Sequence, residues 1–432
     1  MVLSAAARAC AAVSALCNRY SFVFSAAARD PSARRPAMSR RVRVALVNSA
    51  DPRGLKVGGI ETYIRDYIQY RPDDIDLLFI GPDEIGDLPP DQISRVRFRG
   101  RELDFLPIAR LDDSVNRAPQ SITQSETFRF AALMWRKRGL IGPLLRRGGY
   151  SVELRRVEYA PIFAALRVPF IQMLHVWGDR SKPMSGILGR HHRLRAATEY
   201  LAAALAVRFY TVNPEVTSMF ARRYWPFGAK FHTLTTWANT DLFTPQPFAA
   251  VLPLRLVFAG RCDAFKRLDL MLRVVAMARQ AAVPVEFHYV GDGDLSAHPE
   301  FSEVSEITVV HGRKSAADVA AILAGCHIGL LTSEFEGMPR FVLECLASGR
   351  PVVALHLPQL QPLYAMSAAG HLVPRGPDQL AQMAARIADL GAAIGAGRVD
   401  PVCVARAAAA HRPERLLAPI FDDHRRLAAR RA

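Results

Sequence analysis

The sequence predicts an α/β protein built from two doubly wound domains, each with a parallel sheet covered by helices on both faces. Short β-branched runs alternate with helical stretches in both halves of the chain. The length of 432 residues suits two or three domains, and half of the residues are hydrophobic, enough for large cores. A proline-rich segment near residues 245–253 separates the two series and is the expected linker.

The expected N-terminal domain, residues 38–245, opens with a buried strand at 41–50. Gly58 and Gly59 follow, and then an amphipathic helix with apolar side chains at Ile60, Ile64, Tyr67 and Ile68. The same domain should contain strands at 74–82, 169–176 and 206–213, with helical stretches around 128–145 and 158–168.

The expected C-terminal domain, residues 254–432, has a clearer alternation, and its last helix could return to the N-terminal domain. Strands are predicted at 254–260, 285–291, 307–312, 327–333 and 350–356, and helices at 267–281, 315–326 and 339–349. Because ligands of open parallel sheets bind at the carboxyl ends of the strands, two such domains should form their site in the cleft between them.

Residues 1–37, rich in Ala, Ser and Arg, are expected to be a leader or the product of a start site assigned too early, with Met38 the first residue, and to be disordered. No apolar run reaches the ~20 residues that a membrane-spanning helix needs. The six cysteines lack metal-ligand spacing, so reduced thiols are expected, with neither disulfides nor zinc. These features favour a cytoplasmic protein.

The net charge of +16 is concentrated in the front half, where residues 38–245 hold 31 Lys and Arg against 21 Asp and Glu. Such an excess favours anionic partners: phosphates, nucleic acid or an acidic membrane surface. The Lys and Arg residues come in short pairs along the chain, however, and these pairs carry no signature of a nucleic-acid-binding motif.

Two sets of residues after C-terminal strands carry the predicted chemistry. Arg261 and Lys266 follow the first strand, before a helix, where two cations can bind a diphosphate. Glu336 lies in the turn after 327–333, and Pro339 suits the start of the next helix. The amides of Arg340 and Phe341 should then face the cleft at the positive helix end. Glu344, about two turns along, can accept both hydroxyls of a ribose.

The segments "GRCDAFKRLDLML", "YVGDGDL" and "HGRKSAADVAAILAGCHIGLLTSEFEGMPRFVLECLASGRPVVA" resemble the nucleotide-sugar-binding half of glycosyltransferase family 4, retaining enzymes of the GT-B fold. The resemblance is strong from Leu254 to about Pro374. The front half matches more loosely through "GGIETY", "MLHVWGD" and "ANTDLF".

The resemblance implies a role for each matching residue. Arg261 and Lys266 would bind the donor diphosphate, and Glu344 would hold the ribose. Glu336 and His175 would lie at the reacting centre as catalytic residues. Gly337, Arg340 and Phe341 would line the donor site, and Gly58 and Gly59 the loop that approaches the donor or acceptor.

It further implies a metal-independent hexosyltransferase, without cofactor, using a UDP- or GDP-sugar and a saccharide or lipid-linked acceptor for a surface polysaccharide or glycolipid. The basic-apolar segments Arg136–Arg147 and Gly186–Leu205 could lie on an anionic membrane, or be ordinary amphipathic helices with a solvated basic face. The alternatives are a GT-B-fold UDP-sugar epimerase and a basic nucleic-acid-binding protein.

Three positions depart from the family pattern. Arg267 stands where glycine usually follows the lysine, and is a candidate third phosphate-binding cation. Asn239 replaces a common glycine in "ANTD". Arg340 replaces a small or apolar residue and could narrow the sugar pocket, so the identity of the donor sugar is not determined. The "GDGD" at 291–294 is interpreted as a structural turn and not as a metal-binding DxD motif.

Overall fold

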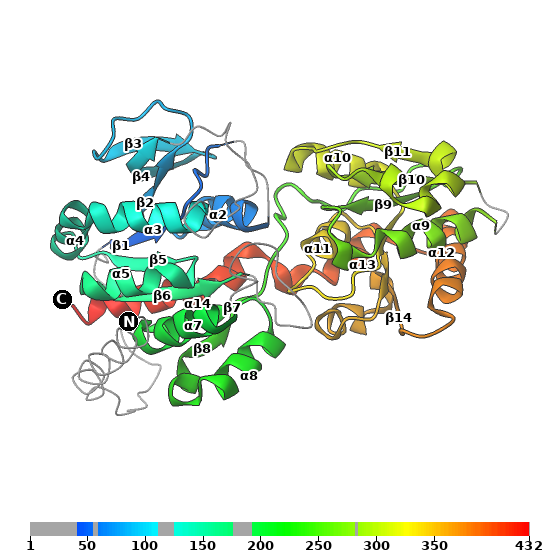
Figure 1. Cartoon of the computed structure of the whole chain (residues 1–432). Coiled ribbons are helices and arrows are strands. Elements are labelled where there is room, and N and C mark those ends of the chain that lie inside the picture. Colours follow the sequence, from blue (N-terminus) through cyan, green and yellow to red (C-terminus); the bar gives the residue numbers. More distant parts are fainter. Residues whose placement is uncertain (1–40, 55–58, 111–124, 176–191, 281–283, 432) are drawn as a thin grey trace, which may run out of the picture.

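The computed structural model describes residues 41–54, 59–110, 125–175, 192–280 and 284–431. They form two α/β lobes that lie side by side (Figure 1). The first lobe follows the chain from β1 to β8, and the second begins at β9.

The N-terminal lobe is built on an eight-stranded sheet in the order β3-β4-β2-β1-β5-β6-β7-β8. All neighbouring strands pair in parallel except β3 and β4, which are antiparallel. The strands are Val42–Val47 (β1), Ile75–Asp83 (β2), Ser94–Phe98 (β3), Arg101–Arg110 (β4), Ser151–Leu154 (β5), Phe170–Leu174 (β6), Arg208–Thr211 (β7) and Phe231–Thr233 (β8).

Helices cover both faces of this sheet, so alternate strand residues enter two separate cores. One face packs against Glu126–Arg136 (α3), Arg138–Arg147 (α4), Ala160–Ala165 (α5), His192–Leu205 (α7) and Pro214–Arg223 (α8). The other packs against Gly59–Tyr70 (α2) and Pro413–Ala429 (α14). The last helix of the chain thus belongs to the core of the first lobe, where Leu417, Ile420 and Phe421 are buried.

The C-terminal lobe contains a six-stranded, fully parallel sheet in the order β11-β10-β9-β12-β13-β14. Its strands are Leu254–Ala259 (β9), Val285–Val290 (β10), Thr308–Val310 (β11), Ile328–Leu331 (β12), Val352–Leu355 (β13) and Gly370–Val373 (β14). Its helices are Leu268–Arg279 (α9), Ala316–Gly325 (α10), Arg340–Ala347 (α11), Gln379–Gly395 (α12) and Pro401–Arg406 (α13). Their apolar faces form a single core with the sheet.

Three features of the first lobe were not expected from the sequence. The hairpin β3–β4 adds an antiparallel edge, the four-residue strand β5 lies at the centre of the sheet, and the helical stretch around 128–145 is two helices. Lys137 separates α3 from α4 with φ −92° and ψ 14°, outside the helical region. Among the described residues, no helix has the length and hydrophobicity needed to cross a membrane, and Cys262, Cys326, Cys345 and Cys403 are free thiols.

Candidate functional site

The turn between β12 and α11 holds Glu336 against Lys266. The Glu336 carboxylate forms an ion pair with Lys266 Nζ, and its Oε1 accepts a hydrogen bond from Ser333 Oγ at 3.0 Å. Only 12% and 16% of the Glu336 and Lys266 side-chain surfaces are exposed. The residues are distant in sequence but meet because β9 and β12 are neighbours, so the loops that follow them share one end of the sheet.

Side-chain hydrogen bonds to backbone carbonyls hold these two loops in place. Thr332 Oγ1 lies 3.0 Å from the carbonyl oxygens of both Lys266 and Arg267. Gln359 Nε2 donates to the Glu336 carbonyl at 2.9 Å. The Lys266–Glu336 pair is therefore held by groups on three different segments and does not depend on one flexible loop.

Arg261 lies in the same loop after β9 but is mostly exposed. It pairs with Asp263 at 2.8 Å, and 66% of its side-chain surface is open to solvent. Arg261, which the sequence predicted as a site residue beside Lys266, therefore pairs with Asp263 and not with Glu336. Its guanidinium remains accessible to an anion at the mouth of the sheet.

Glu344 lies one turn into α11 and is already engaged by Arg340. Arg340 Nε donates to Glu344 Oε1 at 2.9 Å, and each side chain is 15% exposed. Burial raises the pKa of the Glu344 carboxyl above its usual value, although Arg340 acts in the opposite direction. A carboxylate has about four acceptor positions, so capacity remains for further hydroxyl donors.

Arg340 also crosses to the N-terminal lobe, where it forms an ion pair with Asp66 of α2. Asp66 is 1% exposed and is further bound by Arg99 at 2.9 Å and by Trp237 Nε1 at 3.1 Å. Arg340 therefore bridges one carboxylate from each lobe. Asp66 was not predicted as a site residue, because its only signal in the sequence is an acidic residue among the apolar positions of the helix after Gly59.

Gly337 is a second point of contact between the lobes. Its carbonyl accepts a hydrogen bond from Asn213 Nδ2 at 3.0 Å. A Cβ at this position would lie 2.9 Å from Val212 Cγ2, too close for any larger residue without movement. The glycine of the "EG" turn is thus required for the close approach of the N-terminal lobe.

Phe341 contributes its backbone and not its ring to the candidate site. The side chain is 7% exposed and packs edge-on against Phe258 in the C-terminal core, with ring centroids 5.4 Å apart. Pro339 is the N-cap of α11, one residue outside the position expected for it. The amides of Arg340 and Phe341 lie in the first turn, where helical N–H groups lack intrahelical partners.

His175 lies at the end of β6 in the N-terminal lobe. Its Nε2 is 3.2 Å from Arg155 Nη1, and its ring packs edge-on against Tyr63 at 4.6 Å between centroids. Burial lowers the pKa of the His175 imidazole well below its usual value, and the cations Arg155 and Arg156 lower it further. The ring is therefore neutral at physiological pH.

Two further sequence expectations concern glycine positions. Gly58 lies outside the described residues, and Gly59 is the first residue of α2. Arg267, which replaces the family glycine, has φ 53° and ψ 53°. Its guanidinium pairs with Asp269 at 2.7 Å and Glu334 at 2.8 Å, so in this structure two carboxylates balance its charge.

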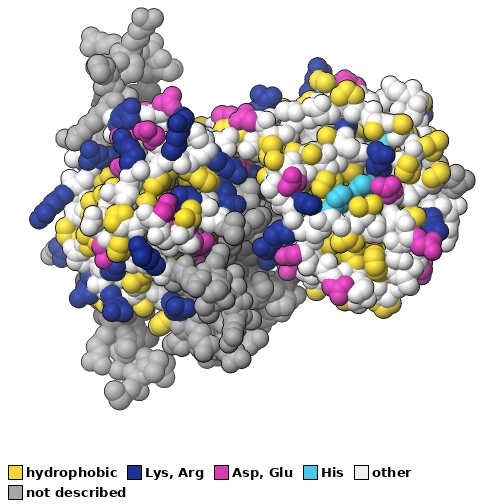
Figure 2. Space-filling model, turned by 90° about the horizontal axis from the view of Figure 1, so that it is seen from above, with side chains coloured by type: hydrophobic (Ala, Val, Ile, Leu, Met, Phe, Trp, Pro, Cys, Tyr) yellow, Lys and Arg dark blue, Asp and Glu magenta, His cyan; other side chains and the backbone are white. Residues whose placement is uncertain are grey.

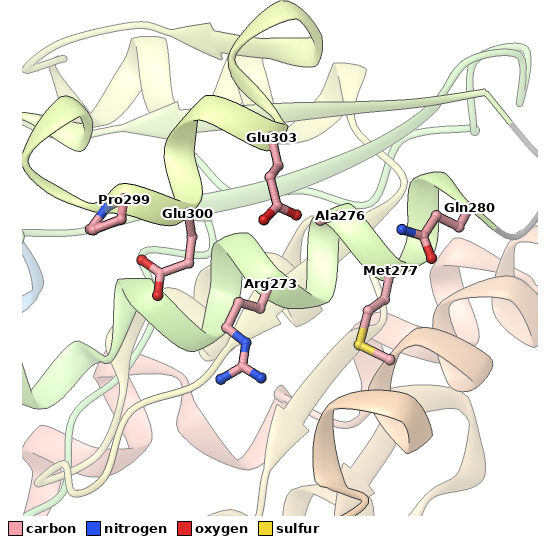
Figure 3. Close-up of a pocket in the computed structure, with 7 residues that line it drawn as sticks. All are labelled: Arg273, Ala276, Met277, Gln280, Pro299, Glu300 and Glu303. Atoms are coloured by element: carbon pink, nitrogen blue, oxygen red, sulfur yellow. The ribbon is translucent and has the colours of Figure 1, made fainter.

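A pocket between α9 and the 3-10 turn Pro299–Glu303 is not part of this cluster (Figure 3). It is lined by residues of those two segments and by the C-cap of α9: Arg273, Ala276, Met277, Gln280, Pro299, Glu300 and Glu303. Neither the strand-end loops nor α11 contribute to it, so it carries none of the predicted chemistry.

Comparison with known proteins agrees with this architecture. Residues 253–390, most of the C-terminal lobe, match the family model described as "Glycosyl transferases group 1". No curated protein sequence matches the chain. The C-terminal lobe thus carries the sequence features of group 1 glycosyltransferases, while the match does not extend to the first lobe.

Solved structures extend the likeness to both lobes and about nine tenths of the chain. Sucrose-phosphate synthase from Thermosynechococcus elongatus is 17% identical, with a TM-score of 0.67, covering 90% of this chain and all of its own. The lipopolysaccharide outer core galactosyltransferase WaaB is 13% identical, with a TM-score of 0.56 and coverages of 88% and 98%. A trehalose-6-phosphate structure from E. coli with bound UDP-2-fluoro glucose is 10% identical, with a TM-score of 0.60 and the same coverages. At these identities the likeness shows the fold, and the expected GT-B fold is confirmed.

Proposed function

We propose that this protein is a retaining glycosyltransferase that moves a hexose from a UDP- or GDP-sugar to a saccharide or lipid-linked acceptor. The observation that carries the proposal is the partly buried Lys266–Glu336 pair at the carboxyl ends of β9 and β12, beside the start of α11. It joins a cation, a carboxylate and a helix N-terminus within the segment that matches group 1 glycosyltransferases.

In the proposed donor complex, Lys266 and the exposed Arg261 bind the diphosphate. Charge develops on this group as the bond to the sugar breaks, and preorganised cations stabilise that charge. The amides at the start of α11 add the positive end of a helix dipole. We infer that these groups take the place of a divalent cation, so that transfer is metal-independent and needs no cofactor.

Glu344 would accept the ribose hydroxyls through the carboxylate positions that Arg340 leaves open. Glu336 would contact the transferred sugar and stabilise positive charge at the anomeric carbon. Binding of the diphosphate by Lys266 would free part of the Glu336 carboxylate from its present ion pair. His175, on the opposite lobe, would complete the sugar site, and the product would retain the donor's anomeric configuration.

For the acceptor we propose a lipid-linked saccharide or glycolipid of a surface polysaccharide pathway, bound by the N-terminal lobe on the cytoplasmic face of the plasma membrane. Figure 2 shows Lys and Arg side chains around this lobe with hydrophobic side chains between them. On α3 and α4, Phe128, Trp135 and Leu140 are 46%, 47% and 38% exposed beside basic residues. Such a surface suits anionic headgroups.

A panel of nucleotide sugars tests the transfer reaction. The matching UDP- or GDP-sugar should raise the melting temperature and be turned over in the presence of EDTA, and NMR should show the retained anomer. An inverted product or strict dependence on manganese would contradict the mechanism. Absence of binding to every nucleotide sugar would overturn the proposed function.

Vesicle sedimentation tests the membrane part separately. The protein should sediment with phosphatidylglycerol vesicles, and not with phosphatidylcholine vesicles, and should be released by high salt because surface charges are screened. The triple variant Arg136/Lys137/Arg138→Ser should lose most of this binding. If the protein sediments with neither vesicle type, a soluble acceptor becomes the better proposal.

A further inference from the structure

The central strand of the N-terminal sheet places a buried ion pair behind His175. Glu153 of β5 has no exposed surface, and Arg155, just after the strand, is 2% exposed. The two side chains form an ion pair, and the Arg155 guanidinium also packs over the rings of Tyr63 and Tyr67, 4.6 Å and 5.1 Å from their centroids. Buried charges are costly unless they are paired in good geometry, so a retained pair calls for a role.

The last helix of the chain holds this pair in place. His424 of α14 lies with Nε2 3.2 Å from Glu153 Oε2 and with Nδ1 2.8 Å from Ser151 Oγ. All three side chains are buried. A polar connection therefore runs from α14 through β5 to Arg155, within the core beneath the predicted sugar site.

Arg155 in turn determines which hydrogen bonds His175 can make. A guanidinium carries only donors, so the 3.2 Å contact from Arg155 Nη1 requires His175 Nε2 to accept. A neutral imidazole that accepts at Nε2 carries its proton on Nδ1. Within the part of the chain that the structure describes, the charged groups that act on the ring are Arg155 and Arg156, and both oppose a second proton.

We propose that Arg155, held by Glu153, is a positioning residue that fixes His175 in its Nδ1–H tautomer. His175 then meets the substrate as a hydrogen-bond donor and not as a general base. This proposal rests on the proposed function only for the identity of the hydrogen-bond acceptor that His175 meets, a hydroxyl oxygen of the transferred sugar. The tautomer itself is a property of the free protein.

The tautomer is measured on the full chain without any substrate. In two-bond ¹H–¹⁵N spectra of histidine-labelled protein, assigned with His175→Gln, the His175 signals should show a protonated Nδ1 and an unprotonated Nε2 that do not change between pH 6 and 8. A protonated Nε2, or a doubly protonated ring at pH 7, overturns the proposal.

The double variant Glu153→Leu/Arg155→Met removes both charges together and avoids leaving one buried charge without its partner. His175 should then show a mixture of both tautomers. With the nucleotide sugar that the panel identifies, kcat should fall about tenfold, the loss expected for one misplaced hydrogen bond, while the donor KM changes less than twofold. A variant that keeps the Nδ1–H tautomer, or the full kcat, contradicts the proposal.

Arg425→Gln is the matched control, because it breaks an ion pair between α14 and Asp74 at 2.7 Å without touching Glu153 or Arg155. This control should leave the His175 tautomer and kcat unchanged. If it shows the same change in tautomer and the same fall in kcat as the double variant, the effect comes from a general loosening of α14 and the proposal fails. If no nucleotide sugar is turned over at all, the proposed function fails while the tautomer measurement still decides the role of Arg155.

Discussion

Arg340 of the C-terminal lobe forms an ion pair with Asp66 of the N-terminal lobe, and the same guanidinium donates to Glu344 at 2.9 Å. Glu344, the residue proposed to hold the ribose, is thus connected through Arg340 to the N-terminal lobe. Because Arg340 is bound by one carboxylate from each side, donor binding at Glu344 and the arrangement of the lobes should affect each other.

Asp66→Asn should loosen the two lobes. It removes the charge that attracts Arg340 and weakens a charge-assisted hydrogen bond, costing on the order of 1.5–3 kcal/mol. Small-angle X-ray scattering should show a larger radius of gyration in the absence of donor. Asp73→Asn, which affects only an exposed pair with Arg101, is the control. Identical scattering from both variants would show that the ion pair does not hold the lobes together.

Glu344→Gln should weaken binding of UDP or GDP, whichever the enzyme uses, by about one to two orders of magnitude. Loss of a charge-assisted hydrogen bond to a ribose hydroxyl has this magnitude. Calorimetry measures the change, and Glu334→Gln in the same motif is the control because Glu334 pairs with Arg267. Unchanged nucleotide affinity in the Glu344 variant would remove this residue from the donor site.

Glu336→Gln should lower kcat by about a hundredfold or more while the donor KM changes little, because its charge acts mainly in the transition state. Lys266→Ala should lower kcat and also weaken donor binding. Steady-state kinetics of both variants and of the double variant give the coupling, which should be non-additive since the two groups are in contact. Additive effects, or a change confined to KM, would argue against these roles.

Arg267→Gly should be more stable than Arg267→Ala by about 1 kcal/mol. The residue has φ 53°, a left-handed conformation that costs a side-chain-bearing residue roughly 1–2 kcal/mol and that glycine adopts freely. Both variants lose the same ion pairs with Asp269 and Glu334, so the difference isolates the backbone. Urea unfolding measures it, and an alanine variant equal to or better than glycine would contradict this explanation.

His327 should make folding sensitive to acid. Its Nδ1 accepts from the Arg255 amide at 2.9 Å, so Nε2–H donates to the Ala249 carbonyl at 3.2 Å, and burial lowers its pKa. Below an unfolded-state pKa of about 6.5 the unfolded chain binds a proton that the native state refuses, so stability falls as pH falls. The stability advantage over His327→Gln should shrink by up to about 1 kcal/mol per pH unit from pH 6.5 to 5.5. Urea unfolding at several pH values measures this difference in unfolding free energy, and a difference that does not change with pH would refute the role given to His327.

The two-lobe α/β architecture was predictable from the amino-acid pattern, because the strands and helices of the C-terminal half up to residue 356 are encoded by local periodicity and turn residues. The later elements β14, α12 and α13 were not predicted. The same pattern placed Lys266 and Glu336 in two separate sets after C-terminal strands, and the structure brings these two residues into contact. Both follow strands of one parallel sheet, and the carboxyl ends of such strands meet at the same edge. Their catalytic and donor-binding roles stay predictions.

The charged neighbours of the site became visible only in the folded chain. Asp66 meets Arg340, and His424 meets Glu153, through packing between segments more than 270 residues apart. No local pattern marks such a pair, because each member alone looks like an ordinary surface charge and becomes a buried partner only when α14 and α11 reach the first lobe. The short strand β5 escaped prediction for the same reason: its charged residue, Glu153, is stabilised in the core by partners that lie elsewhere in the chain.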